Sequence, residues 1–501
     1  MTNLRKAWLN GLFVAVVIVL GISLKASHTY YPATINHYFL EDETTKAYSA
    51  LYRVADKSAE SLDALVVLAK SHGNIYWLKK AAALNSLDAQ LALVELDNDA
   101  TDLYWLNEAA NSGDAASQFE LSLVEPNKQR MLELKKLSAD QGFPPAIIAI
   151  AKYYYETQQE GLAKSYLIKA SEYDSLSQFK LARILWKEGS HELAYNHFSS
   201  IVNLQPKAKQ YIHAIDNIPR VSLTDLMTIN ANINSTYIPE SCSQNIQFVA
   251  TSLDSVVQAK AFKTNFENDK RFAKLPICIA PIVWVPRDDF TCKVQSNRQT
   301  CDLNSISEQL QEPNFTHLSL FLENGKAYVN NGVMYLDTAD TYSVFVHELA
   351  HFVGFVDEYP VSKELASQYC LNPNLTVPNL LIANDDEDVT KNNTYKIWQQ
   401  FIKSINDDSF RKAERDGAYI DDLHSISLAK TNTCSNLSIK AYKPTSRMTF
   451  MEFHDVNYIP ALYIAMWQDL LSKDHQSIAV ARYFLDQATT KKAKEYWGSY
   501  Y

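Results

Sequence analysis

Cysteine is absent from residues 1–241 of this 501-residue chain, and no two cysteines form a Cys-x-x-Cys pair. This absence argues against a zinc site built from cysteine. The chain also lacks a lysine- or arginine-rich stripe and has a formal net charge of −10, which argues against a nucleic-acid partner. The hydrophobic content of 47% and the charged content of 21% are ordinary for a globular protein. A chain of this length is expected to hold two or three domains.

All cysteines lie between residues 242 and 434, in the part of the chain that follows residue 220, where an even number suggests disulfides in an exported domain. The six are Cys242, Cys278, Cys292, Cys301, Cys370 and Cys434. Six cysteines allow up to three disulfides in 15 pairings. Cys292 and Cys301 would close a short polar loop and form the first pair to test. Six free buried thiols are the alternative.

The N-terminus has the composition of a targeting segment. Arg5 and Lys6 precede an uncharged apolar run over residues 7–24, typical of a secretory signal or a single membrane-spanning anchor. The positive charges on the amino side predict that everything after residues 1–30 is exported, to the periplasm or the cell exterior. Because no small-x-small cleavage site follows, an uncleaved membrane anchor is favoured, and a cleaved signal with secretion is the alternative.

A degenerate helical repeat follows this segment. The string WLKKAA at 77–82 recurs as WLNEAA at 105–110, LKKLS at 134–138 and YLIKAS at 166–171. The shared leucine of these strings, at 78, 106, 134 and 167, recurs in steps of 28, 28 and 33 residues. Helix-pair repeats of this size stack into an α-solenoid. The pattern resembles Sel1-like repeats, relatives of the tetratricopeptide type, over residues 45–215. The resemblance implies a surface for protein partners, and a helical spacer is the alternative.

A pentapeptide in the second half carries most of the chemistry. His347, Glu348 and His351 form the pattern HExxH, which puts two imidazoles on one face of a helix and a carboxylate beside them. Such imidazoles hold Zn²⁺, which lowers the pKa of bound water to about 7, and the glutamate acts as the general base. Apolar residues at helical spacing, including Phe345 and Leu349, predict a helix that starts near Asp340 or Thr341.

The residues after this helix suggest the third zinc ligand. Residues 347–357 resemble the metzincin signature HExxHxxGxxH, with Asp357 in place of the last histidine. Gly354 can adopt the positive φ that returns the chain to the metal. The triplet at 357–359 also resembles the Asp-Glu-Tyr ending of the IgA-peptidase-like branch, although this chain is one residue shorter before it. Asp357 is the expected ligand, with Glu358 and His454 in reserve.

The resemblance extends to a methionine far downstream. Metzincins place a methionine in a tight turn beneath the zinc, and the string 446–450 resembles that turn, which makes Met448 the expected residue. Met451 is the alternative. Phe450 stands where several metzincins carry a tyrosine that binds the transition state, so the oxyanion partner is unassigned, with Tyr442 and His454 as candidates.

Hydrophobic patterning predicts an α+β domain over residues 220–501. Strands are expected at 246–250, 277–285, 318–322 and 328–336, and helices at 253–272, 459–471 and 477–497. The boundary with the repeats falls near residues 206–219. In metzincins, the strand before the active-site helix lies along the substrate, so Tyr328 and Val329 are candidates for that strand. A plain hairpin is the alternative.

Together these features predict an exported, membrane-tethered zinc endopeptidase with N-terminal Sel1-like repeats. Two alternatives remain open. One is a non-catalytic envelope scaffold that keeps zinc for structure, and the other is a zinc amidase that acts on cell-wall peptide.

Overall fold

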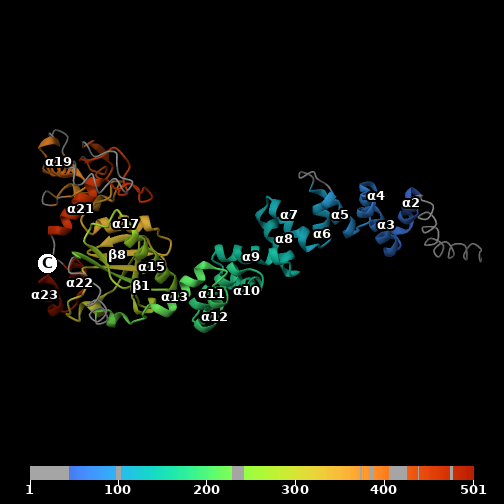
Figure 1. Ribbon diagram of the computed structural model, residues 1–501, viewed down its shortest axis with the longest axis horizontal. Helices are drawn as coiled ribbons and strands as arrows, with labels where there is room; N and C mark the ends of the chain where they lie inside the picture. Colours follow the sequence, from blue (N-terminus) through green and yellow to red (C-terminus); the bar gives the residue numbers. More distant parts are fainter. Residues whose placement is uncertain are drawn as a thin grey trace, which may run out of the picture. The chain divides into compact units, whose positions relative to one another are not determined.

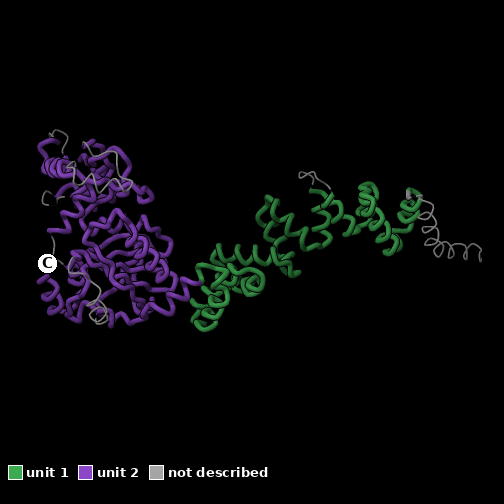
Figure 2. Tube along the Cα trace, in the orientation of Figure 1, with its two compact units in different colours: residues 1–208 green, residues 209–501 purple. Residues whose placement is uncertain are grey.

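The computed structural model describes residues 44–96, 103–227, 242–372, 375, 377–383, 389–405, 426–437, 439–473 and 478–500. The chain divides into two compact units, Met1–Ala208 and Lys209–Tyr501 (Figure 2). The predicted anchor over residues 1–30 lies outside the described residues. Among the residues that are described, no helix has the length and apolar character needed to cross a membrane.

The first unit is a run of helices that pack on their neighbours in sequence (Figure 1). These are α2 (Thr44–Ala55), α3 (Ala59–Ser71), α4 (Ile75–Ala82), α5 (Leu87–Leu96), α6 (Tyr104–Asn111), α7 (Ala115–Val124), α8 (Lys128–Asp140), α9 (Pro144–Glu156), α10 (Glu160–Ala170), α11 (Ser175–Lys187), α12 (His191–Ser200) and α13 (Pro206–Asn217), which runs past the boundary. Ala81, Ala109 and Ala170 occupy one position of the repeated string and are fully buried. Their small side chains let adjacent helices approach closely, as a repeat array requires.

The second unit is built on a mixed six-stranded sheet. Its strands are β1 (Gln244–Ala250), β2 (Ile277–Ile279), β3 (Val283–Trp284), β6 (His317–Leu322), β7 (Tyr328–Asn330) and β8 (Val333–Asp337). Their order is β2-β1-β6-β8-β7, with β3 paired to β1. Every pairing is parallel except that of β7 with β8, so an antiparallel hairpin forms one edge.

Two helices connect this sheet to the predicted site. Helices α15 (Leu253–Asn268) and α17 (Tyr342–His351) contact the sheet and one another (Figure 1). A cluster of aromatic rings fills the space between them, because Phe345 of α17 contacts Phe248 of β1 and Phe262 of α15. Burial of these rings is the main force that fixes α17 against the sheet.

Two predicted elements are divided in the structure. The strand expected at 277–285 is split into β2 and β3 around Pro281, which has no N–H to donate to a ladder. The helix expected at 477–497 is split into α22 (Val480–Gln487) and α23 (Lys491–Gly498), and its first residue lies outside the described residues. Thr490 starts the second helix by accepting a hydrogen bond from the N–H of Ala493, and Glu308 accepts the N–H groups of Thr489 and Thr490.

The remaining elements surround the sheet and the end of α17. They are the hairpin β4 (Cys292–Gln295) and β5 (Arg298–Cys301), the small sheet of β9 (Leu381–Ala383), β10 (Ala429–Thr431) and β11 (Lys440–Lys443), the helices α16 (Asn304–Ser307), α18 (Lys363–Cys370), α19 (Asn393–Ile405) and α21 (Ala461–Lys473), and the short 3-10 turns η1 (Leu223–Asp225), η2 (Arg287–Asp289) and η3 (Val389–Lys391).

Three disulfides cross-link this unit, as the even number of cysteines predicts. They join Cys242 to Cys278, Cys292 to Cys301 and Cys370 to Cys434. The expected pair of Cys292 and Cys301 is confirmed and closes the β4–β5 hairpin at its base. No cysteine is left free.

Candidate metal centre

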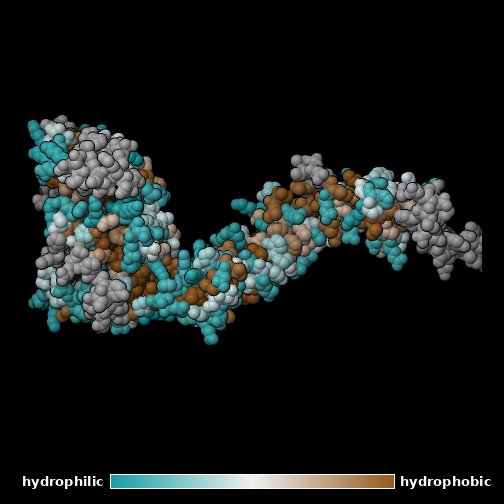
Figure 3. Space-filling model, in the orientation of Figure 1, coloured by the Kyte–Doolittle hydropathy of each residue, from teal (hydrophilic) through white to brown (hydrophobic). Residues whose placement is uncertain are grey.

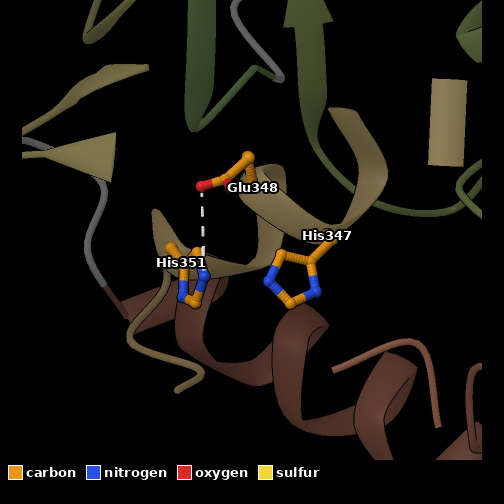
Figure 4. A group of neighbouring side chains, drawn as sticks. All are labelled: His347, Glu348 and His351. Carbon is orange, nitrogen blue, oxygen red and sulfur yellow. Dashed lines mark ion pairs between the residues drawn. The ribbon is translucent and has the colours of Figure 1, made fainter. Parts of the chain in front are cut away.

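Helix α17 holds three predicted site residues close together. Phe345 points into the core, where it is fully buried against Phe248. His347, Glu348 and His351 have ligand atoms that all lie within 4.8 Å of one another. Figure 4 shows these three side chains projecting from the end of α17. The helix therefore gathers two imidazoles and a carboxylate, as the HExxH spacing predicts.

Asp357 joins this cluster from the loop after the helix. Its Oδ1 atom lies 3.0 Å from Nε2 of His347 and 3.3 Å from Nε2 of His351. The chain turns back because Gly354 has a φ of +86°, a conformation that residues with a Cβ rarely adopt. The loop thus brings the aspartate beside both imidazoles.

Hydrogen bonds on the far side of each imidazole determine which nitrogen carries a proton. Nδ1 of His347 lies 2.8 Å from the carbonyl oxygen of Phe450, and Nδ1 of His351 lies 2.8 Å from that of Phe355. Because a carbonyl oxygen only accepts, both Nδ1 atoms donate. In a neutral imidazole, Nε2 then keeps a free lone pair. Both rings therefore direct an Nε2 acceptor toward Asp357.

This arrangement of acceptors fits a zinc ion. Two nitrogen lone pairs and a carboxylate oxygen repel one another unless a proton or a metal cation lies between them. Ligand atoms around a tetrahedral zinc, with bonds of about 2.0–2.2 Å, are roughly 3.3 Å apart. The nitrogen-to-oxygen distances of 3.0 and 3.3 Å are close to that separation. Carbonyl acceptors behind the imidazoles are also typical partners of zinc-binding histidines.

In the absence of metal, protons take the place of a cation. Burial lowers the pKa of His351, but its hydrogen bond with Asp357 and the nearby carboxylates outweigh burial and raise the pKa to about 9. Burial raises the pKa of Asp357, but the hydrogen bonds with His347 and His351 outweigh it and hold this pKa well below its usual range. A metal ion that binds here must therefore displace a proton from His351.

Glu348 has the properties expected of a general base. The residue is only 6% exposed, and its Oε2 atom has no hydrogen-bond partner among the described residues. This oxygen lies 4.0 Å from Nε2 of His351, the contact dashed in Figure 4. Burial also raises the pKa of Glu348. A buried carboxylate with a free oxygen beside the imidazoles is suited to accept a proton from a reacting water.

Glu358, a reserve ligand in the sequence, is directed away from the imidazoles. Its carboxylate accepts hydrogen bonds from Thr449 at 2.5 Å, from Tyr463 at 2.6 Å and from Asn379 at 3.0 Å. Nζ of Lys443 lies 3.7 Å away. Glu358 is 1% exposed, and these groups surround it. It therefore ties the loop after α17 to α21 and to the turn before it, and it is not a metal ligand.

His454 and Tyr442 also lie apart from the cluster. Nδ1 of His454 lies 3.1 Å from Oδ1 of Asp455, and its side chain is 44% exposed. Tyr442 is in β11, where it pairs with Lys430 and Leu381. Neither residue makes a hydrogen bond or ring contact with His347 or His351 among the described residues, so neither is supported as a ligand or an oxyanion partner.

The expected methionine turn needs a correction. Met448 is 51% exposed, which does not agree with a position beneath the imidazoles. Met451, the alternative, is fully buried, and its carbonyl accepts the N–H of Glu358 at 3.0 Å. The chain turns inward at Thr449, whose hydroxyl lies 3.2 Å from the N–H of Met451. Met451 is therefore the methionine on the core side of this turn.

The expected substrate strand is the edge of the sheet. Tyr328 and Val329 lie in β7, which forms a hairpin with β8 and lies against α17. Among the described residues, β7 makes ladder hydrogen bonds with no strand other than β8. Just before β7, the N–H of Lys326 donates to the carbonyl oxygen of Asn297 in the β4–β5 turn, so the hairpin adjoins the start of this edge strand. An edge strand without a second partner is a place where another extended chain can pair.

Sequence reasoning missed two residues beside the cluster. The ring of Tyr359 lies nearly parallel to that of His347, at 17° with centroids 6.3 Å apart. Asn379 is fully buried and pairs through its amide with both the N–H and the carbonyl of Val356. The Asp-Glu-Tyr triplet could have signalled Tyr359, whereas nothing in the sequence marks Asn379.

Comparison with known proteins gives no independent assignment. No protein-family model matches the chain, and no match is found among curated proteins. The function is therefore inferred from the residues of this centre and their geometry.

Proposed function

We propose that this chain is a zinc-dependent endopeptidase that resembles the metzincins, and their IgA-peptidase-like branch in particular. The observation that carries this proposal is the convergence of the two Nε2 atoms of His347 and His351 on Asp357, next to a buried Glu348 oxygen that has no hydrogen-bond partner among the described residues. Burying a carboxylate oxygen without a hydrogen bond costs free energy. A purely structural zinc site does not require such an oxygen, so a scaffold role leaves the buried Glu348 carboxylate unexplained.

Each residue has a separate role in the proposed reaction. His347, His351 and Asp357 hold the zinc, which when bound acidifies water and polarises the scissile carbonyl. The carbonyl groups behind the two imidazoles keep their Nε2 lone pairs oriented. Glu348 takes a proton from the attacking water and returns it to the leaving amine. Burial raises the pKa of Glu348 in the direction of neutral pH, and this helps the carboxylate both to accept and to release a proton.

Tyr359 is our candidate for the group that stabilises the developing oxyanion. Its ring lies against that of His347, and the residue is 38% exposed, so the side chain borders both a proposed ligand and solvent. A neutral hydrogen-bond donor at this place can stabilise negative charge on the carbonyl oxygen. Phe450 has no such donor.

The substrate would bind as an extended chain along β7. The outer edge of this strand offers backbone groups for an added antiparallel or parallel strand, and α17 lies alongside. Recognition by backbone pairing accepts many sequences, so side-chain preferences would come from the residues that flank the edge.

The helical unit would serve as a site for protein partners or substrate. Several of its large apolar side chains are exposed, including Val67 at 67%, Tyr76 at 61% and Leu123 at 63%. Figure 3 shows hydrophobic residues at the surface of this unit. The three disulfides suit an oxidising compartment, so we propose that the chain is exported and tethered to the membrane by its N-terminal segment.

A Glu348→Gln variant tests the proposed reaction. This change keeps the shape of the side chain but removes the base, so zinc content should stay at one ion per chain while peptide cleavage falls roughly a hundredfold or more. Zinc is measured by elemental analysis and cleavage with a mixture of quenched fluorescent peptides. Glu495→Gln, an exposed acid in α23, is the matched control and should retain full activity.

Two results would contradict the proposal. Full peptide cleavage by Glu348→Gln would exclude Glu348 as the base. A wild-type protein that binds zinc and cleaves no peptide would favour the scaffold, or an amidase if it opens cell-wall peptide instead.

A further inference from the structure

The β4–β5 hairpin is closed at its base by a disulfide and contacts strand β7. Its strands pair from Cys292 with Cys301 to Gln295 with Arg298, and the disulfide closes the base. The two turn residues, Ser296 and Asn297, both have positive φ, as a tight two-residue hairpin turn requires. Arg298 therefore occupies a fixed place beside the turn.

The hairpin is attached to the proposed substrate strand. The phenol of Tyr328 in β7 donates to the carbonyl oxygen of Gln299 at 2.8 Å and lies 2.7 Å from the hydroxyl of Thr300. The ring of Tyr328 also stacks on Tyr335 of β8, with centroids 4.8 Å apart. The guanidinium of Arg298 lies over the ring of Tyr328, 5.3 Å from its centroid. Arg298 is thus held at the edge where the peptide would lie.

Strand β7 connects the hairpin to the candidate centre. Tyr328, the residue that Arg298 contacts, lies in β7, and β7 packs against α17, the helix that carries His347 and His351. The guanidinium therefore lies at the edge of the sheet that adjoins this helix.

Within the part of the chain that the structure describes, no acidic side chain forms an ion pair with Arg298. Arg271 and Arg482 in the same unit form ion pairs with Asp269 and Asp486. Arg298, in contrast, is exposed and has no carboxylate within ion-pair distance among the described residues. Its guanidinium contacts the ring of Tyr328, and none of its five N–H donors makes a hydrogen bond with a residue that the structure describes.

We propose that Arg298 binds a substrate carboxylate beside the scissile bond, so that this peptidase prefers peptides with an acidic group there. The inference rests on the proposed peptidase function and deepens it by naming a substrate class. A guanidinium held against an aromatic ring is well suited to a carboxylate, because it can form two parallel hydrogen bonds. The carboxylate can belong to an aspartate or glutamate side chain or to the C-terminus of the peptide.

Matched peptides test this preference with the full chain in its zinc-loaded form. A peptide that the wild type cleaves is made with Glu or Gln at each position near the cut, and with a free or an amidated C-terminus. In one of these pairs, we expect kcat/KM to be about tenfold higher or more for the peptide with the carboxylate than for its neutral partner. A charge-assisted hydrogen bond contributes a free energy of this size. The Glu and Gln pair and the acid and amide pair identify which carboxylate is bound.

Variants of the hairpin then locate the interaction. Arg298→Gln should remove the preference by slowing cleavage of the acidic peptide alone, and Arg298→Lys should keep part of it. Lys293→Gln makes the same charge change on the opposite strand and should leave the preference intact. Zinc content should be equal in all variants.

The outcomes separate this inference from the function on which it rests. Cleavage of acidic and neutral peptides at equal rates by the wild type, or an unchanged preference in Arg298→Gln, overturns the role of Arg298 and leaves the peptidase intact. Failure of the wild type to cleave any peptide overturns both.

Discussion

Zinc binding should release a proton from His351 at neutral pH. In the metal-free centre, the hydrogen bond with Asp357 and the surrounding carboxylates outweigh burial and raise the pKa of His351 to about 9. Zinc requires the neutral imidazole, so the metal and this proton compete for the same nitrogen. The apparent zinc affinity should therefore rise about tenfold for each pH unit between about 7 and 9.

The same proton makes the stability of the metal-free protein fall as the pH rises, whereas the zinc affinity increases. The folded pKa of about 9 lies above the ordinary value of 6.5, so protonated His351 stabilises the fold fully below pH 6.5. That stabilisation is lost as the pH rises through about 9. The difference between the two values corresponds to about 3 kcal/mol. Metal-free protein should melt at a lower temperature at pH 9 than at pH 6.5.

Calorimetry measures the proton directly. Zinc titrations at pH 7.5 in two buffers with different ionisation enthalpies give the number of protons released, which we expect to be about one. The Asp357→Asn variant loses the carboxylate that raises the pKa of His351. Burial should then lower this pKa, so the number of protons released on zinc binding should fall towards zero. Asp455→Asn, which removes an aspartate beside His454, is the control and should leave the release unchanged. A wild-type protein that binds zinc at pH 7.5 without releasing a proton would refute this account of the centre.

Two further substitutions test the loop after α17. Gly354→Ala should lower the stability of the metal-free protein by about 1–2 kcal/mol, because φ is +86° while the nearest atom to a new Cβ, Pro378 Cδ, is 3.9 Å away. Gly161→Ala is the control, because Gly161 lies in α10 with open space around it, and this change should leave stability unchanged or raise it. Equal melting temperatures of the two variants would contradict the explanation from the positive φ of Gly354. Tyr359→Phe should lower kcat roughly tenfold to a hundredfold with little change in zinc content or KM, whereas Tyr442→Phe should not. Equal losses in both tyrosine variants would remove Tyr359 from its proposed role.

Local patterns in the sequence anticipate much of the centre. The spacing of His347 and His351 fixes both imidazoles on one helix, and Gly354 supplies the turn that follows. Cys292 and Cys301 are close enough in sequence for a hairpin to bring them together. These features depend on residues a few positions apart, so backbone geometry alone determines them.

Features that depend on distant segments could not be read from the sequence. The partners of Glu358 come from three separate places, at Asn379, Thr449 and Tyr463, and only the folded chain brings them to one carboxylate. Likewise, Met448 and Met451 are equally apolar in sequence, and only the packing of the turn buries one of them. The approach of Arg298 to Tyr328 also depends on how one hairpin packs on another.

Asp357 and Glu358 are adjacent, yet one carboxylate faces the imidazoles and the other enters the core. A one-residue insertion or deletion between Gly354 and Asp357 would exchange their directions. The shorter aspartate would then fail to reach Thr449 and Tyr463, while the longer glutamate would crowd the two histidines. Evolution can therefore change the length of this loop only by rebuilding the core and the cation site together, and an insertion scan across residues 354–358 should find no tolerated position.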